Sequence, residues 1–155
     1  SYFFDDFEGV DSSDSPELAR IQALEFIARH FRYSVASVVE DVSNPLLPVG
    51  TDRDVKVKAY HEHVRHISKL EGALILKFSD FVDNAGSLHH HYAYDNPKAR
   101  YFIERYTPLL KVYREAFEKN DFATVYNSNK ALLRLEDVEK QFGKFHVGLD
   151  IPFSV

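Results

Sequence analysis

The chain contains no cysteine, methionine or tryptophan, and only six glycines and six prolines among its 155 residues. Without cysteine there can be no disulfide framework, no thiolate metal ligand and no cysteine nucleophile. No apolar run approaches the length of a membrane-spanning helix, and no signal-peptide pattern opens the chain. We therefore expect a cytoplasmic protein with no membrane partner.

The charge and composition are those of an acidic, soluble domain. Acidic residues outnumber lysine and arginine by 24 to 19, which gives a net charge of −5. Proteins that bind nucleic acid present basic faces, so we expect no nucleic-acid binding. The length suits a single domain, here residues 1–155. The missing initial methionine and the opening Ser1–Phe7, which reads like the interior of an element, suggest that helices upstream are missing.

Apolar residues recur at helical spacing through most of the chain, which predicts an all-α bundle of about six helices. Asp14 is the predicted cap of the first helix, which Pro16 opens. The first helix is expected to bury Leu18, Ile21, Leu24, Ile27 and Phe31. A short second helix is expected to carry Val35 to Val42, and a third to run from about Asp52 to Leu70. A break at Gly72 precedes the fourth helix, which holds Asp80. The fifth helix is expected to start at Pro97, and the last to run from Asp121 to Phe142. Gly143 is expected to end the last helix, leaving 143–155 as an extended tail.

Two histidine clusters invite a metal interpretation. In His61–His66 the position four beyond His61 is Arg65, so the zinc-protease motif of two histidines four apart is not met. The run His89–His91 offers imidazoles, but three consecutive residues rarely converge on one ion in regular structure. We interpret the first cluster as a solvated helix face and the second as a surface loop.

The strongest constellation is formed by Lys77, Asp80 and Asn84. Asp80 ends an apolar run, so we expect it to be largely hidden from water, as a salt-bridge partner or a metal ligand. The three residues share one helix face and would suit a metal-bound phosphate, with Asp80 on the ion, Lys77 offsetting phosphate charge and Asn84 orienting substrate or water. The alternative is a buried ion pair of Lys77 with a carboxylate elsewhere, and Asn84 as a helix C-cap.

The segment from Lys77 to Asn84 resembles the K-L-A-D-R-x-x-N helix of HD-domain metal-dependent phosphohydrolases, especially the branch containing the ppGpp hydrolases. Similar matches follow the family's order over about 16–117, at His30–Asn44, Lys58–Val64 and Tyr113–Phe117. The resemblance implies an HD-like fold and hydrolysis of a nucleotide or related phosphate ester. It also implies a divalent ion, manganese, magnesium or another transition metal. The thirteen phenylalanines and nine tyrosines fit a homodimer interface as well as a core.

The site implied by this resemblance comprises an early histidine, an adjacent His-Asp pair and a late aspartate, to which Asp80 corresponds. Asp6 stands for the paired aspartate, and Asp5 replaces its histidine. Lys77, Asn84 and Arg65 would face the substrate. No histidine precedes His30, so either the missing ligands lie upstream or the protein is an inactive HD-like module for protein interaction or regulation.

Overall fold

The structure, a computed structural model, describes residues 15–119 and 128–153, and every regular element in these ranges is helical. The predicted all-α class is therefore confirmed. The elements in chain order are α1 (Pro16–Phe31), α2 (Tyr33–Val42), α3 (Arg53–Ile67), α4 (Glu71–Gly86), the short α5 (Leu88–His91), the 3-10 turn η1 (Pro97–Ala99), α6 (Arg100–Lys119) and α7 (Ser128–Gly148). Within these ranges, no helix combines the length and the apolar character that crossing a bilayer requires.

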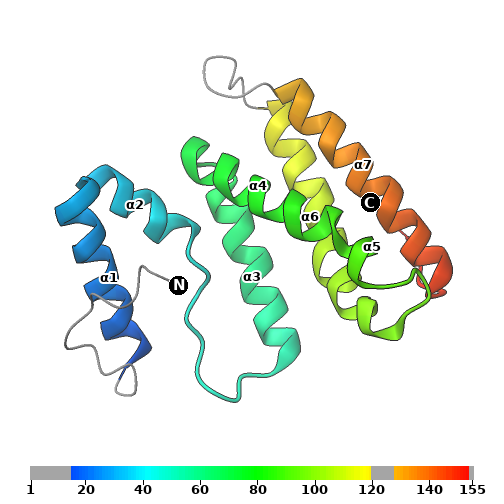
Figure 1. Cartoon of the computed structure of the whole chain (residues 1–155), viewed down its shortest axis with the longest axis horizontal. Helices are drawn as coiled ribbons and strands as arrows, with labels where there is room; N and C mark the ends of the chain where they lie inside the picture. The colour runs from blue at the N-terminus through cyan, green and yellow to red at the C-terminus, as the bar shows by residue number, and fades with distance from the viewer. Residues whose placement is uncertain (1–14, 120–127, 154–155) are drawn as a thin grey trace.

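The helices form a bundle with a protruding hairpin. Figure 1 shows α1 and α2 at one end, α6 and α7 at the other, and α3 and α4 between them. The hairpin meets the body where α2 packs on α4, while α6 packs on both α7 and α3. This arrangement puts the segment that follows α2 beside α3 and α6.

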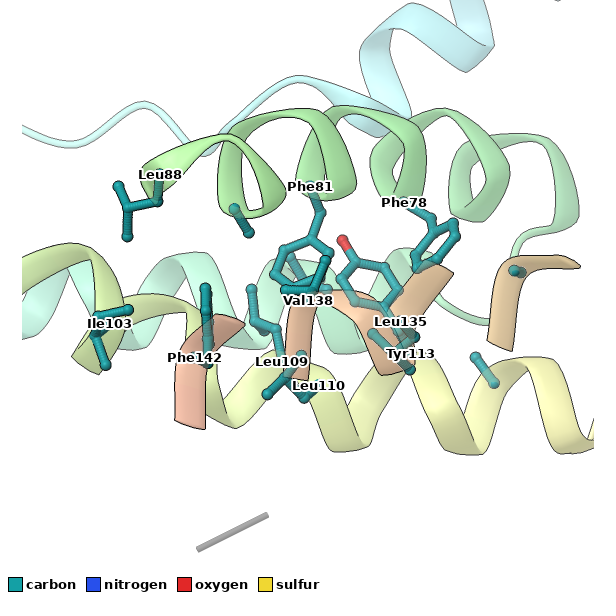
Figure 2. Close-up of a cluster of buried hydrophobic side chains, with 14 of the residues drawn as sticks. Phe78, Phe81, Leu88, Ile103, Leu109, Leu110, Tyr113, Leu135, Val138 and Phe142 are labelled. Carbon is teal, nitrogen blue, oxygen red and sulfur yellow. The ribbon is translucent and has the colours of Figure 1, made fainter. Parts of the chain in front are cut away.

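The core lies where α4, α6 and α7 meet. Figure 2 shows Phe78 and Phe81 of α4 pointing toward Tyr113 of α6 and Leu135 of α7. The rings of Phe78 and Tyr113 pack edge to face with centroids 5.2 Å apart, and Phe81 lies 4.8 Å from Tyr113. Fully burying such a side chain contributes about 1.5–3 kcal/mol. This aromatic cluster fixes the position of α4, which carries the predicted site.

Side-chain caps mark where several helices begin. Ser15 Oγ accepts a hydrogen bond from the Leu18 amide, so Ser15 caps α1, and the predicted cap Asp14 lies outside the described residues. The Asp52 carboxylate accepts from the Asp54 amide at 2.8 Å and starts α3. Each such cap stabilises its helix by about 1 kcal/mol. The starts of α1 and α3 therefore follow from local chemistry, whereas α2 and α4 begin without a side-chain cap.

The predicted burial of α1 is wrong. No residue of α1 is buried, and Leu18, Ile21 and Phe31 are each about half exposed, at 50%, 53% and 50%. The reason is positional, because α1 packs chiefly on α2 and lies at the end of the molecule (Figure 1).

The predicted end of the last helix is also wrong. The helix continues through Gly143 to Gly148, so the first part of the expected tail over 143–155 is helical. The buried side chains of Phe145 and His146 favour continuation, and their packing outweighs the cost of about 1 kcal/mol for a helical glycine. Gly72 likewise lies inside α4, and the break falls at 68–70.

Candidate functional site

The first predicted site residue, Lys77, is buried at 6% exposure on α4. Its ammonium donates to Asn44 Oδ1 at 2.8 Å and to the Val42 carbonyl at 3.2 Å. It makes no ion pair with any carboxylate among the described residues, so the predicted buried ion pair is not found there. Burial lowers the pKa of Lys77, and the Asp80 carboxylate partly offsets this. Two neutral acceptors thus hold a buried cation.

The second, Asp80, is exposed, so the prediction that it is hidden from water is wrong. The buried face of α4 centres on Phe78 and Phe81, and Asp80 lies at the edge of that face. Asn84 Nδ2 donates to Asp80 Oδ1 at 2.7 Å and to the Asp80 carbonyl at 2.9 Å. Asn84 is therefore not a C-cap, because α4 runs on to Gly86 and Ser87 caps it.

A pocket of about 290 Å³ lies between the segment after α2, α3 and α6. We call it the Tyr60 pocket, and its lining comprises Asn44, Pro45, Leu47, Lys56, Ala59, Tyr60, Tyr101 and Arg105. The Lys77–Asn44 hydrogen bond connects the predicted helix face to its wall. None of the lining residues was among the site residues predicted from the sequence.

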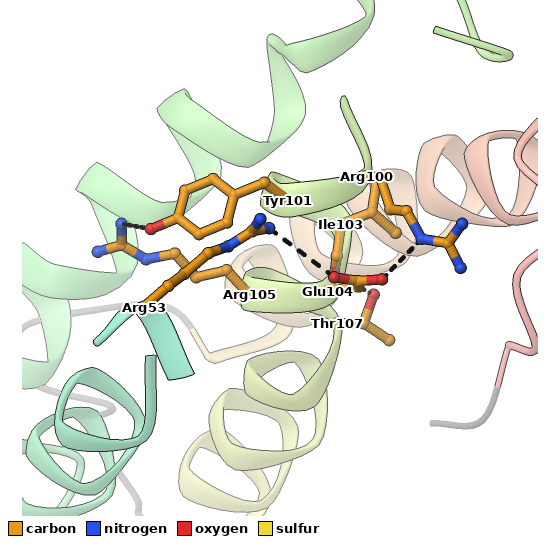
Figure 3. A network of polar contacts seen from close by, with 7 residues as sticks. All are labelled: Arg53, Arg100, Tyr101, Ile103, Glu104, Arg105 and Thr107. Atoms are coloured by element: carbon orange, nitrogen blue, oxygen red, sulfur yellow. Dashed lines mark hydrogen bonds and ion pairs between the residues drawn. The ribbon is translucent and has the colours of Figure 1, made fainter. Parts of the chain in front are cut away.

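Arg105 is the central cation of the Tyr60 pocket. Its guanidinium carbon lies 4.1 Å from the centre of the Tyr60 ring, and Nη1 donates to the Tyr101 hydroxyl at 3.3 Å. Its Nε is buried and has no hydrogen-bond partner. Figure 3 shows Arg105 beside Tyr101. The neighbouring Glu104 forms ion pairs with Arg53 and Arg100. Arg105 therefore keeps a donor that no described protein group satisfies.

The electrostatics of the pocket favour a neutral phenol among cations. Burial, with help from Tyr106 and Asp80, raises the pKa of Tyr60 to about 12, against the opposing effect of Arg105. Tyr60 therefore stays protonated and can donate a hydrogen bond at neutral pH. The Lys77 ammonium lies 5.5 Å from the centre of its ring, and Lys56 forms no ion pair with another described residue.

This arrangement is suited to an anion. A guanidinium with an unused donor, a phenol that can donate and the ammonium group of Lys56 are groups that proteins use to bind phosphate and carboxylate. Asp80, the nearby carboxylate that raises the pKa of Tyr60, is the opposing charge.

The described residues do not by themselves form the four-ligand metal site that the resemblance implies. In the ranges 15–119 and 128–153, no three histidine, cysteine, aspartate or glutamate residues gather in one place. Asp80 is the only predicted ligand within these ranges, because Asp5 and Asp6 lie outside them. The Nε2 atom of His61 donates to the Arg105 carbonyl at 2.6 Å, so this nitrogen is not free to bind a metal.

The last predicted substrate residue, Arg65, lies elsewhere. It is exposed near the end of α3 and lines a separate groove, so the structure does not bring it into the Tyr60 pocket with Arg105. Arg105 is the cation that the sequence interpretation missed. One signal was present, because Tyr101 and Arg105 are four residues apart and face the same side of a helix.

Comparisons with protein-family models, with curated proteins and with solved structures found no match to this chain. The HD-domain resemblance therefore stays a prediction that depends on the residues quoted for it.

Proposed function

We propose that the protein binds a small phosphate-bearing molecule in the Tyr60 pocket, with Arg105 as the principal anion-binding residue. The observation that carries this proposal is the buried Nε of Arg105, which lacks a partner although the side chain is held by Tyr60 and Tyr101. A buried donor without an acceptor costs about 1–3 kcal/mol. A phosphate oxygen that displaced the groups now covering Nε would remove that cost and could accept a bidentate pair of hydrogen bonds from the guanidinium.

The size and composition of the pocket support a small ligand. Its volume of about 290 Å³ is at the lower end of the range of about 300–1,000 Å³ for small-molecule sites. Pro45 and Leu47 add apolar surface to the lining. A ligand with one anionic end and one apolar or planar end would use both.

Calorimetric titration with inorganic phosphate, pyrophosphate and a panel of nucleoside monophosphates at low ionic strength tests the proposal. Arg105→Gln should weaken binding of the best probe by about tenfold or more, because it removes a charge-assisted pair. Lys98→Gln is the matched control, since Lys98 is exposed on η1 and does not line the Tyr60 pocket. Equal binding by wild type and Arg105→Gln, or no binding of any probe, would contradict it.

A second proposal is that the bound phosphate ester is hydrolysed, as in the HD-type phosphohydrolases that the sequence resembles. The observation in its favour is Asp80, whose carboxylate is exposed, oriented by Asn84 and close enough to raise the pKa of Tyr60. A carboxylate so placed can orient and deprotonate an attacking water, a contribution of about 10²–10⁴ in rate.

Phosphate release from a nucleotide panel, measured with manganese or magnesium present, tests this second proposal. Asp80→Asn should reduce turnover by about 10²-fold. Asp83→Asn is the matched control on the same helix, because Asp83 is also exposed and its carboxylate forms no hydrogen bond or ion pair with a described residue. Turnover unchanged by Asp80→Asn would reject hydrolysis at this site. Phosphate binding without turnover would instead support the inactive HD-like module.

A further inference from the structure

A second groove lies farther along α3 and α6, toward the C-terminal end of each helix. It has a volume of about 580 Å³ and is lined by Arg65, Ser68, Lys69, Pro108, Lys111, Val112, Glu115, Ala116 and Lys119. We call it the basic groove. It shares no lining residue with the Tyr60 pocket, so any ligand it takes is independent of the function proposed above.

Positive charge is concentrated in this groove although the chain as a whole carries −5. Four of the lining side chains are cationic, and one is acidic. The acidic one, Glu115, forms an ion pair with Lys119, whose Nζ lies 3.1 Å from Glu115 Oε2. Arg65, Lys69 and Lys111 form no ion pair within 4.0 Å with any residue in the described ranges. Three cations are thus available to a ligand.

Part of the groove lining is apolar. Pro108, Val112 and Ala116 lie along one side of α6 at intervals of four residues, which places them in a row. The lining includes no aromatic side chain on which a base could stack. An apolar row between cations suits a chain segment that carries carboxylates and small apolar side chains.

We propose that the basic groove docks a short acidic segment of a partner protein. The carboxylates of that segment would pair with Arg65, Lys69 and Lys111, and an apolar side chain would rest on Val112. Nucleic acid fits less well, because the net charge of −5 repels a polyanion at long range and no stacking surface is present.

The test uses a short fluorescein-labelled peptide of glutamate, aspartate and leucine, and a matched peptide with glutamine and asparagine replacing the acids. Fluorescence anisotropy with the full chain should detect the acidic peptide and not the neutral one. Lys111→Glu should weaken binding by about fivefold or more, because it exchanges an attraction for a repulsion. Lys98→Glu makes the same change in net charge away from the groove and should leave binding unaltered.

Three results would overturn the proposal. The first is no binding of the acidic peptide at low salt. The second is equal weakening by Lys98→Glu and Lys111→Glu, which would mean that only net charge matters. The third is tighter binding of a single-stranded oligonucleotide than of the peptide, lost on Lys111→Glu, which would identify a phosphate-backbone site instead.

Discussion

The ammonium of Lys77 is hydrogen bonded to the side-chain carbonyl of Asn44 at 2.8 Å, across 33 positions of the chain. The bond ties α4 to the segment that follows α2. That segment then supplies Pro45 and Leu47 to the Tyr60 pocket. A lysine expected to face a phosphate therefore holds a wall of the pocket.

Removing the acceptor should destabilise the fold. Asn44→Ala leaves the buried ammonium of Lys77 with only the Val42 carbonyl, and we expect the free energy of unfolding to fall by about 1 kcal/mol. Urea denaturation measures this. Asn44→Asp keeps an acceptor and should retain the stability that Asn44→Ala loses. Equal losses in both variants would show that the hydrogen bond is not the cause.

Acidification should destabilise the protein through His63. The Nε2 atom of His63 is buried without a partner, and burial, followed by the charge of Lys77, lowers its pKa below the ordinary 6.5. The folded state therefore binds the proton more weakly than the unfolded state. The contribution of neutral His63 to the free energy of unfolding is therefore complete above pH 6.5. It is lost as the pH falls through the lowered pKa of His63 in the folded state.

Unfolding free energies measured in urea from neutral to mildly acidic pH check this. His63→Gln should flatten the pH dependence, whereas His91→Gln, which changes an exposed ring on α5, should leave it unchanged. An identical slope in wild type and His63→Gln would rule out this origin.

The two glycines of α7 should respond to alanine in opposite ways. A Cβ on Gly148 would collide with the backbone carbonyl of Tyr94 and reach 3.0 Å from the Asp95 nitrogen. We expect Gly148→Ala to cost about 1–3 kcal/mol, because backbone cannot move aside cheaply. A Cβ on Gly143 meets nothing within 4 Å, so Gly143→Ala should add about 0.5–1 kcal/mol. Thermal and urea denaturation of both variants should show opposite signs.

The ion pair between Arg114 and Glu139 should contribute more than a typical surface pair. Arg114 Nη2 donates to both carboxylate oxygens, at 2.6 and 2.7 Å, and joins α6 to α7. Glu139 raises the pKa of Arg114. Since both side chains remain partly exposed, we expect Glu139→Gln to cost about 1 kcal/mol. The Lys140–Asp137 ion pair is more exposed than the Arg114–Glu139 pair. Asp137→Asn should therefore cost about 0.5 kcal/mol or less in the same denaturation experiment.

Most of the helices could be predicted because their signals are local. Pro97 and Asp52 mark starts that the structure retains, at η1 and at the cap of α3. Whether Ile21 is buried could not be predicted. Periodicity shows that one face of a helix is apolar, but it does not show whether another element covers that face.

The site was only partly accessible to the sequence. The placement of Lys77, Asp80 and Asn84 on one helix could be predicted, because residues three and four apart on a helix have a fixed spacing. Asp80 was expected to be buried because an apolar run precedes it, but the run turns its face to the core and leaves Asp80 at the edge. The juxtaposition of Tyr60 and Arg105 joins α3 to α6, and a spacing rule within one helix cannot predict it.

Pro108 lies within α6 between Arg105 and Lys111, so one helix carries a residue of each binding surface on either side of a proline. Proline lacks an amide hydrogen, and α6 therefore lacks one backbone hydrogen bond at this place. A helix that lacks this hydrogen bond bends more easily at that place, so we expect a small displacement of the first half of α6 to be reduced before it reaches the second half. We therefore expect ligands to bind the Tyr60 pocket and the basic groove without cooperativity.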